Sequence, residues 1–165
     1  MRDMRRFKQL LPEEDTVKVL ENNTAGVLAV TGDDDYPYAV PVSYVYADGK
    51  IYIHSALEGN KVDGVKRSEK ASFCVIDEDK IVPEEYTTYF RSAIAFGRPR
   101  IVEDAEEKRF ALEELGKKYY PEDTPQNLDK TINNENARVC VIALDIDKLT
   151  GKEAIEFVRE KEAKR

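Results

Sequence analysis

The side chains best suited to chemistry lie close together in one short stretch of the sequence. His54, the only histidine, ends an alternating strand pattern, and Ser55, Asn60 and Lys61 follow it. The pattern predicts a strand that runs through a small-residue loop into a helix beginning near Gly59. Free backbone N–H groups and the dipole at such a helix start favour an anion, and Lys61 adds a full positive charge. The stretch therefore predicts a cradle for a phosphate monoester.

The same residue types also fit other interpretations. An ordinary strand–loop–helix junction can carry an exposed lysine at position 61. The stretch matches neither the G-x-x-x-x-G-K-[ST] loop nor the G-x-G-x-x-G turn, so nothing favours a nucleoside triphosphatase or a Rossmann fold. His54 could donate to the phosphate, bind a metal or haem iron, or pack at the rim of a barrel. One histidine with two separated cysteines, Cys74 and Cys140, does not make a zinc site, so we expect no metal.

Composition limits the classes of protein that the chain can belong to. Its 165 residues are 41% hydrophobic, which predicts a single domain over residues 1–165 with its own core. A net charge of -7 argues against general nucleic-acid binding, which needs a basic surface. No apolar run approaches the length of a membrane span. Cys74 and Cys140 lie in apolar strand-like runs and are expected to be buried, reduced thiols. With no secretory signal at the N-terminus, they favour the cytoplasm.

Hydrophobic periodicity predicts a chain that alternates runs of strands with single helices. We expect helices at 12–22, 59–68, 104–120 and 151–163, and strands at 25–31, 36–46, 50–54, 70–77, 87–103 and 137–146. Residues 77–85 are expected to be a polar connection, and 121–136 a polar loop with one helical turn at 128–132. Tight turns between consecutive strands imply antiparallel pairing. Five or six such strands with peripheral helices favour a small, mainly β barrel.

Two further segments carry residues that a ligand could use. Pro41 interrupts its strand, which must be bulged or open at an edge there, and the segment 40–43 would expose backbone groups to a flat ring. The alternative is a bulge that serves only the barrel. Tyr86, Tyr89, Arg91 and Ser92 open the long strand at 87–103. For these residues a subunit interface or a solvated strand face is the favoured interpretation. Gly97 and Pro99 predict a bend further along the same strand.

The order of these segments resembles the pyridoxamine 5'-phosphate oxidase-like split-barrel superfamily, and within it the branch named for 5-nitroimidazole resistance proteins. The resemblance extends from about residue 4 to residue 152. Its most specific part is the combination of Pro-Val-x-Tyr, His-Ser-Ala…Gly-x-Lys and Tyr-x-Arg-Ser-x-x-x-x-Gly. The segments that carry it are Arg5-Arg6, 27–30, 37–42, 44–46, 48–56, 59–61, 90–98 and 101–104.

This resemblance implies a six-stranded antiparallel split β-barrel of the FMN-binding type, and a homodimer with flavin at the subunit interface. FAD, deazaflavin F420 or haem, the last with His54 as axial ligand, are alternative cofactors. By analogy, Arg91 and Ser92 would approach from a neighbouring strand or from the other subunit. The remaining cofactor contacts would be the backbone of Val40, Pro41, Val42 and Ser43 along the ring, and His54, Ser55, Asn60 and Lys61 around the phosphate and ribityl chain.

The implied function is an FMN-dependent oxidoreductase that reduces a small planar acceptor such as a nitroimidazole. True pyridoxamine phosphate oxidases place several basic residues around the phosphate and use a C-terminal Arg-x-His segment. This chain offers mainly Lys61 and has no second histidine, which argues against vitamin B6 oxidation. If a catalytic proton donor exists, His54 is the candidate. The alternatives are a non-catalytic flavin-binding sensor or carrier, and a haem-binding protein.

Overall fold

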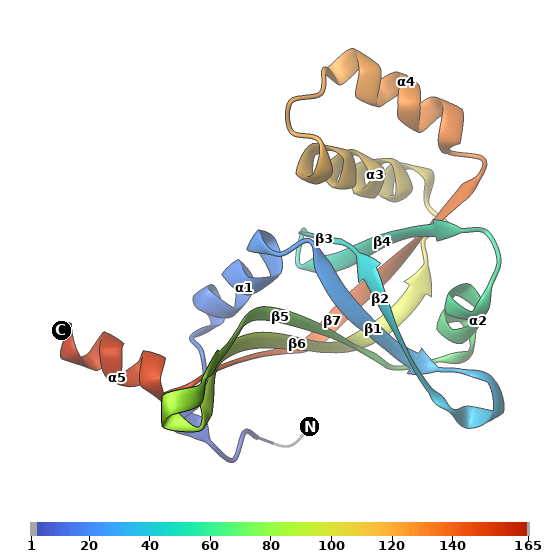
Figure 1. The fold of residues 1–165 in the computed structure, drawn as a ribbon. Helices are drawn as coiled ribbons and strands as arrows, with labels where there is room; N and C mark the ends of the chain where they lie inside the picture. The colour runs from blue at the N-terminus through green and yellow to red at the C-terminus, as the bar shows by residue number, and fades with distance from the viewer. Residues whose placement is uncertain (1–2, 165) are drawn as a thin grey trace.

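A computed structural model describes residues 3–164 of the chain, and all its strands belong to one antiparallel sheet (Figure 1). The spatial order is β2-β1-β5-β6-β7-β4-β3. The expectation of an antiparallel, mainly β fold is confirmed, but the expected strand number of six is wrong. The sheet has seven strands and two open edges: β1 (Ala25–Thr31), β2 (Pro37–Ser43), β3 (Val45–Ala47), β4 (Lys50–Ala56), β5 (Ala71–Val82), β6 (Thr87–Ile101) and β7 (Val139–Glu153).

The seventh strand arises because the strand expected at 36–46 breaks at Tyr44. This side chain is fully buried, and its hydroxyl donates to the Leu20 carbonyl at 2.7 Å. The Tyr44 backbone N–H donates to the Tyr119 hydroxyl at 2.9 Å instead of to a neighbouring strand. On one side of the break β2 pairs with β1, and on the other β3 pairs with β4. The two resulting strands become the two edges of the sheet.

Two strands are longer than the hydrophobic pattern predicts. The segments 77–82 and 147–153 are largely polar, yet both continue as strands because each pairs with β6. The bend expected near Gly97 is confirmed by a register shift between Phe96 and Gly97. A Cβ atom at position 97 would collide with the Asp145 carbonyl, so glycine permits the close approach of β6 to β7. As a consequence, the long β5–β6–β7 ribbon projects beyond the rest of the sheet (Figure 1).

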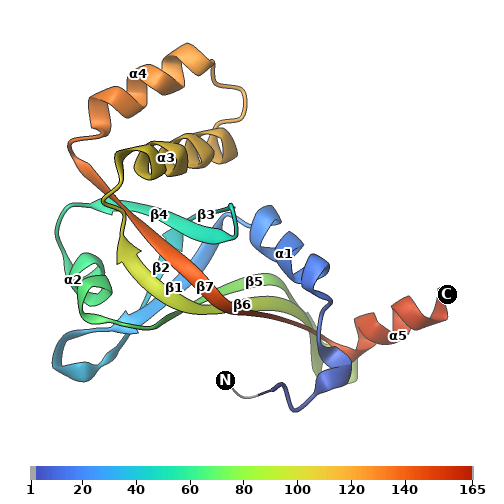
Figure 2. The same ribbon diagram turned by 180° about the vertical axis from the view of Figure 1, so that it is seen from behind.

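Helices cover the sheet or extend from its two ends. The expected loop at 121–136 is wrong: it holds α4, for which Thr124 provides the N-cap by accepting from the Asn127 N–H at 3.2 Å. Figure 2 shows α3 and α4 beyond one end of the sheet and α5 at the other. The helices are α1 (Glu13–Asn22), α2 (Asn60–Arg67), α3 (Ala105–Tyr119), α4 (Pro125–Glu135) and α5 (Ile155–Ala163). The short 3-10 turns are η1 (Phe7–Gln9), η2 (Asp33–Asp35) and η3 (Pro83–Glu85).

The apolar core has two parts. The larger part lies inside the curved sheet and includes Leu20, Leu28, Ile51 and Phe73, all fully buried. The smaller part joins α3 to the outer face of β4 and β7, and comprises Val45, Tyr52, Val102, Ala111, Leu115, Val141 and Ala143. Within residues 3–164, no helix combines the length and apolarity that crossing a membrane requires.

Candidate functional site

A cavity of about 540 Å³ lies between one end of the sheet and the α3–α4 pair. Ser43 at the end of β2, His54 on β4 and Val139 at the start of β7 form its sheet side. Leucine and isoleucine side chains dominate its helix side, where Glu135 is the one acidic group. The helix residues that line it are Leu112, Leu115, Gly116 and Tyr119 of α3, and Leu128, Thr131, Ile132 and Glu135 of α4. The cavity is therefore an apolar chamber with a few polar groups.

His54 reaches this cavity because of the alternation of side chains along β4. His54 lies opposite Val141 of β7 and is exposed, whereas its neighbours Ile53 and Ser55 are buried. His54 and Ser55 therefore point to opposite faces of the strand. The structure places His54 with Ser43 at the cavity and separates its side chain from that of Ser55.

Tyr119 fixes the last turn of α3 over the break between β2 and β3. Its hydroxyl accepts from the Tyr44 N–H at 2.9 Å and donates to the Thr24 carbonyl. Spacings of three and seven residues along α3 predict that Leu112, Leu115 and Tyr119 form a buried stripe, but of the three only Leu115 is buried. All three side chains line the cavity. The helix thus contributes its apolar side to the cavity wall as well as to the core.

The start of α2 offers unsatisfied backbone donors, as expected. Gly59 is the N-cap with φ 123°, a value that favours glycine, and no side chain caps the helix. Among residues 3–164, no acceptor is found for the backbone N–H groups of Asn60, Lys61 and Val62. Three donors and the Lys61 ammonium therefore lie at one helix end, which is the donor set that a phosphate needs.

Ser55 belongs to the same region as Lys61. It lies directly opposite Cys140 on β7, and the Cys140 thiol contacts the Ala56 carbonyl at 3.2 Å. Burial raises the pKa of the Cys140 thiol, and the positive charge of Lys61 opposes that rise. Ser55 and Cys140 are thus neighbours across β4 and β7, and Lys61 follows on α2. The two cysteines are free thiols, with Cys140 buried and Cys74 half-buried.

Pro41 lies on an edge strand, as the sequence predicted. It is opposite Val27 of β1, and the β2 residues with exposed side chains alternate with partly buried ones. Because proline cannot donate a ladder hydrogen bond, its nitrogen is tolerated where it faces the open edge. The backbone of Ser43, two residues on, then faces the same edge. Val40 and Val42 pack their side chains against the core, and their backbone groups face β1, so a ligand at the open edge meets the backbone of Pro41 and Ser43.

Arg91 and Ser92 lie far from His54 within one chain. Arg91 donates to Asp77 at 3.0 Å and lies 3.6 Å from the buried carboxylate of Glu153. Arg91 is opposite Glu153 on β7, whereas His54 is opposite Val141 on the same strand. At about 3.3 Å per residue, the two positions are roughly 40 Å apart along β7. A single chain therefore does not bring Arg91 or Ser92 to the cavity.

The α4 wall of the cavity was missed at the sequence level. The Thr124-Pro125 pair, a good N-cap followed by a good first helical residue, is the signal that could have found it. Among the described residues, no group of three or more histidine, cysteine or acidic side chains is arranged to hold a metal ion.

Comparison with known proteins defines the class of this fold. A family model described as pyridoxamine 5'-phosphate oxidase matches residues 12–153, and the chain belongs to this family. The resemblance that the sequence motifs carry is thereby confirmed. A search of curated proteins finds no significant match.

Solved structures of similar fold come from several bacteria. A candidate 5-nitroimidazole antibiotic resistance protein of Bacteroides thetaiotaomicron is 24% identical, with a TM-score of 0.71 over 87% of this chain and 86% of that one. An FAD-binding protein of Mesorhizobium loti is also 24% identical, with a TM-score of 0.59 over 88% of this chain and 97% of that one. An FAD- and haem-binding protein of Mycobacterium smegmatis is 20% identical, with a TM-score of 0.70 over 89% of this chain and 73% of that one.

Proposed function

We propose that this protein binds FMN and is a flavin-dependent oxidoreductase that reduces a small planar acceptor. The observation that carries the proposal is the position of the apolar cavity. It opens at Ser43, on the free edge of β2, and at His54, on the strand that leads into the uncapped start of α2. A flat ring and an acceptor would find matching surfaces at the cavity, and the phosphate would be held at the start of α2, beyond the end of β4. Membership of the family supports a flavin as the cofactor class.

The described residues fit the two chemically different ends of FMN. The backbone N–H groups at the start of α2, the Lys61 ammonium and the Asn60 side chain would hold the phosphate. Ser55, near the end of the strand that leads into α2, would lie along the ribityl chain. The open-edge backbone of Pro41 and Ser43 would bind the polar edge of the ring, because edge strands carry unpaired donors and acceptors. Val40 and Val42 would hold this segment in place through their pairing with β1.

When bound, FMN supplies the electron transfer, and this chain's residues select and orient the acceptor. The leucine and isoleucine walls of the cavity exclude water and favour an uncharged aromatic molecule. His54 faces the same cavity and is the side chain there that could deliver a proton near neutral pH. A nitroimidazole or a quinone is small, planar and apolar enough for this chamber.

A homodimer would bring Arg91 and Ser92 of one subunit toward the flavin of the other. The β5–β6 ribbon that carries them exposes several large apolar side chains, including Ile76 at 62%, Ile81 at 72% and Tyr86 at 99%. Such a surface is typical of a protein–protein contact. We expect sizing chromatography at micromolar concentration to give a dimer. Elution as a monomer would remove the interfacial site from the proposal while leaving the cradle at Lys61 in place.

The first test is the visible absorption spectrum of freshly purified protein, recorded before and after FMN is added. A two-band flavin spectrum that is present at purification or saturates at one FMN per chain would support the proposal. FAD and deazaflavin F420 are titrated in parallel, and the tightest binder identifies the cofactor. Protein that stays colourless with all three would overturn the flavin assignment.

Turnover is tested separately from binding. The flavin-loaded protein is reduced without oxygen and mixed rapidly with a nitroimidazole or a quinone. Reoxidation at least tenfold faster than in an acceptor-free control is expected for a reductase. Reoxidation no faster than that control would instead leave a flavin carrier or sensor.

Haem is a second candidate because His54 is exposed beside an apolar cavity, and an imidazole in such a place can bind iron. The variant His54→Ala separates the two readings. Haem binding should be lost in this variant, whereas FMN binding should fall only slightly, since the phosphate donors at α2 are untouched. A variant that binds haem as tightly as the wild type would exclude His54 as the iron ligand.

A further inference from the structure

A second pocket, of about 320 Å³, surrounds the 3-10 turn η1 near the start of α5. It is lined by Arg5, Arg6, Phe7, Lys8, Gln9 and Ile155, and we call it the Gln9 pocket. The turn is held against the end of β7, because the Leu11 N–H donates to the Gly151 carbonyl at 3.0 Å and Leu10 bridges to Lys152. The pocket therefore lies at the opposite end of β7 from the His54 cavity.

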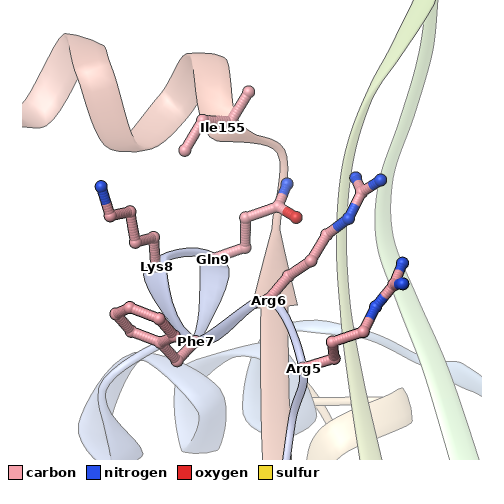
Figure 3. Close-up of a pocket in the computed structure, with 6 residues that line it drawn as sticks. All are labelled: Arg5, Arg6, Phe7, Lys8, Gln9 and Ile155. Atoms are coloured by element: carbon pink, nitrogen blue, oxygen red, sulfur yellow. The ribbon is translucent and has the colours of Figure 1, made fainter.

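The Gln9 side chain is unusual within this pocket. It is only 5% exposed, and its Oε1 is the one buried side-chain oxygen or nitrogen in residues 3–164 that lacks a hydrogen-bond partner. Figure 3 shows the amide extended between Ile155 and Arg6, toward the space that the arginines flank. Native proteins rarely leave a buried acceptor unpaired, so this oxygen points to a donor that a ligand supplies.

The pocket is also strongly basic on a protein whose net charge is -7. Arg5, Arg6 and Lys8 make no ion pair with any carboxylate in the described part of the chain. An adjoining cavity of about 450 Å³ is lined by Met4, the same two arginines and Lys152. Most other arginines of the chain are paired with acidic partners. Unpaired guanidinium groups beside a cavity match the fork geometry of a phosphate.

We propose that the Gln9 pocket binds a phosphate monoester of a small polyhydroxy compound, such as a sugar phosphate or a nucleotide. Arg5 and Arg6 bind the phosphate, and a hydroxyl of the ligand donates to Gln9 Oε1. Phe7, 72% exposed at the rim, provides a face on which a base can stack. Inorganic phosphate satisfies only the arginines, so an ester binds more tightly than the free ion.

The experiment is isothermal titration of FMN-saturated and of FMN-free protein with ribose 5-phosphate, adenosine 5'-monophosphate and inorganic phosphate. Saturating the flavin site first ensures that any further heat reports a different site. Binding of the esters to FMN-loaded protein, at least threefold tighter than inorganic phosphate, is expected. A twofold or larger advantage of the nucleotide over the sugar phosphate would assign the base to Phe7. Absence of binding by both esters at millimolar concentration would overturn the proposal.

Matched variants assign the residues. Arg6→Gln should weaken ester binding at least tenfold, while Arg98→Gln, which removes an exposed arginine paired with Asp147, should leave it unchanged. Gln9→Met keeps the volume but removes the acceptor, and should abolish the preference for esters over inorganic phosphate. If the preference persists in Gln9→Met, or if inorganic phosphate binds as tightly as the esters, the assignment to an ester is wrong. Thermal unfolding of each variant confirms that it is folded.

Discussion

The two ends of β7 carry opposite arrangements of polar side chains. Near Glu153 the charges are engaged with one another: Arg91 pairs with Asp77 and Glu153, and Lys161 donates to Glu153 at 2.8 Å. Near Val139 the backbone donors of α2 and the Lys61 ammonium have no such partners among the described residues. The His54 ring at the same end borders a cavity. The cluster of Arg91, Glu153 and Lys161 uses its charges to hold the fold together, whereas the His54 end keeps polar groups free for a ligand.

The largest expected effect is a loss of stability when Arg91, which pairs with Glu153, is replaced. Arg91→Met leaves the carboxylate of Glu153, which is 3% exposed, with Lys161 alone, and it also removes the contact with the Phe157 ring. Because a buried carboxylate that loses one of its two cationic partners is costly, we expect the free energy of unfolding to fall by about 2–3 kcal/mol. Urea denaturation followed by circular dichroism measures it. Arg98→Gln, at an exposed pair, should change stability by less than about 0.5 kcal/mol.

FMN titration of Arg91→Met below its unfolding midpoint sharpens the comparison. If the cluster around Arg91 is purely structural, the FMN affinity per folded chain stays at the wild-type value. A loss of affinity with unchanged stability would show instead that Arg91 contacts the cofactor, as the family resemblance implies. Ser92→Ala removes only a hydroxyl, so weaker FMN binding in this variant would show that the Ser92 hydroxyl contacts FMN directly.

The next largest effect is a loss of FMN affinity when Lys61, at the start of α2, is replaced. Lys61→Gln removes the full charge from the start of α2 and keeps the side-chain length similar. We expect FMN affinity to fall about tenfold, or about 1.4 kcal/mol, because a charge-assisted hydrogen bond to the phosphate is lost. Quenching of flavin fluorescence on binding measures this change. The matched control is Lys66→Gln, at the other end of the same helix, and an equal loss there would mean that general charge, not the cradle, attracts the cofactor.

Local patterns predicted the elements on which the candidate cofactor residues lie. The strand at 25–31, the edge position of Pro41, the helix start after Gly59 and the bulge at Gly97 each follow from a local rule about proline, glycine or periodicity. These rules work because they depend on local backbone sterics and on the backbone N–H donor that proline lacks. The position of His54 on a strand face opposite to Ser55 also follows from simple alternation.

Non-local partners explain what the patterns missed. Nothing local in the polar segments 77–82 and 147–153 favours a strand, and only pairing with β6 extends them. Likewise, the break at Tyr44 depends on Leu20 and Tyr119, which are distant in sequence. The cavity itself needs α4, whose apolar residues are too few to show a clear helical stripe. Site residues on one element could thus be predicted, but the chamber that joins several elements could not.

A smaller effect is expected at the N-terminus of α3, which forms one wall of the cavity. The Asp104 carboxylate accepts from the Glu107 N–H at 2.7 Å and caps the helix. Asp104→Ala should lower the free energy of unfolding by about 1 kcal/mol. Urea denaturation measures this loss, and Asp104→Asn, which can still cap, is the control. If the His54 end of the molecule is a rigid receptor, FMN affinity should be unchanged in both variants.

The smallest effect is a dependence of stability on pH at the ion pair that joins β6 to α3. Hydrogen bonds from the Arg100 guanidinium, at 2.7 and 2.8 Å, hold the pKa of Glu107 below its usual range. A lowered pKa in the folded state stabilises the protein above the unfolded value near about 4.3, and this contribution is lost as the pH falls through the folded value. Glu107→Gln should therefore cost roughly 0.5 kcal/mol at pH 7, and the gap to wild type should close as the pH falls below about 4. Denaturation at several pH values measures the gap, with Glu106→Gln as an exposed control; a gap that widens in acid would contradict the assignment of Glu107 as an ionised partner of Arg100.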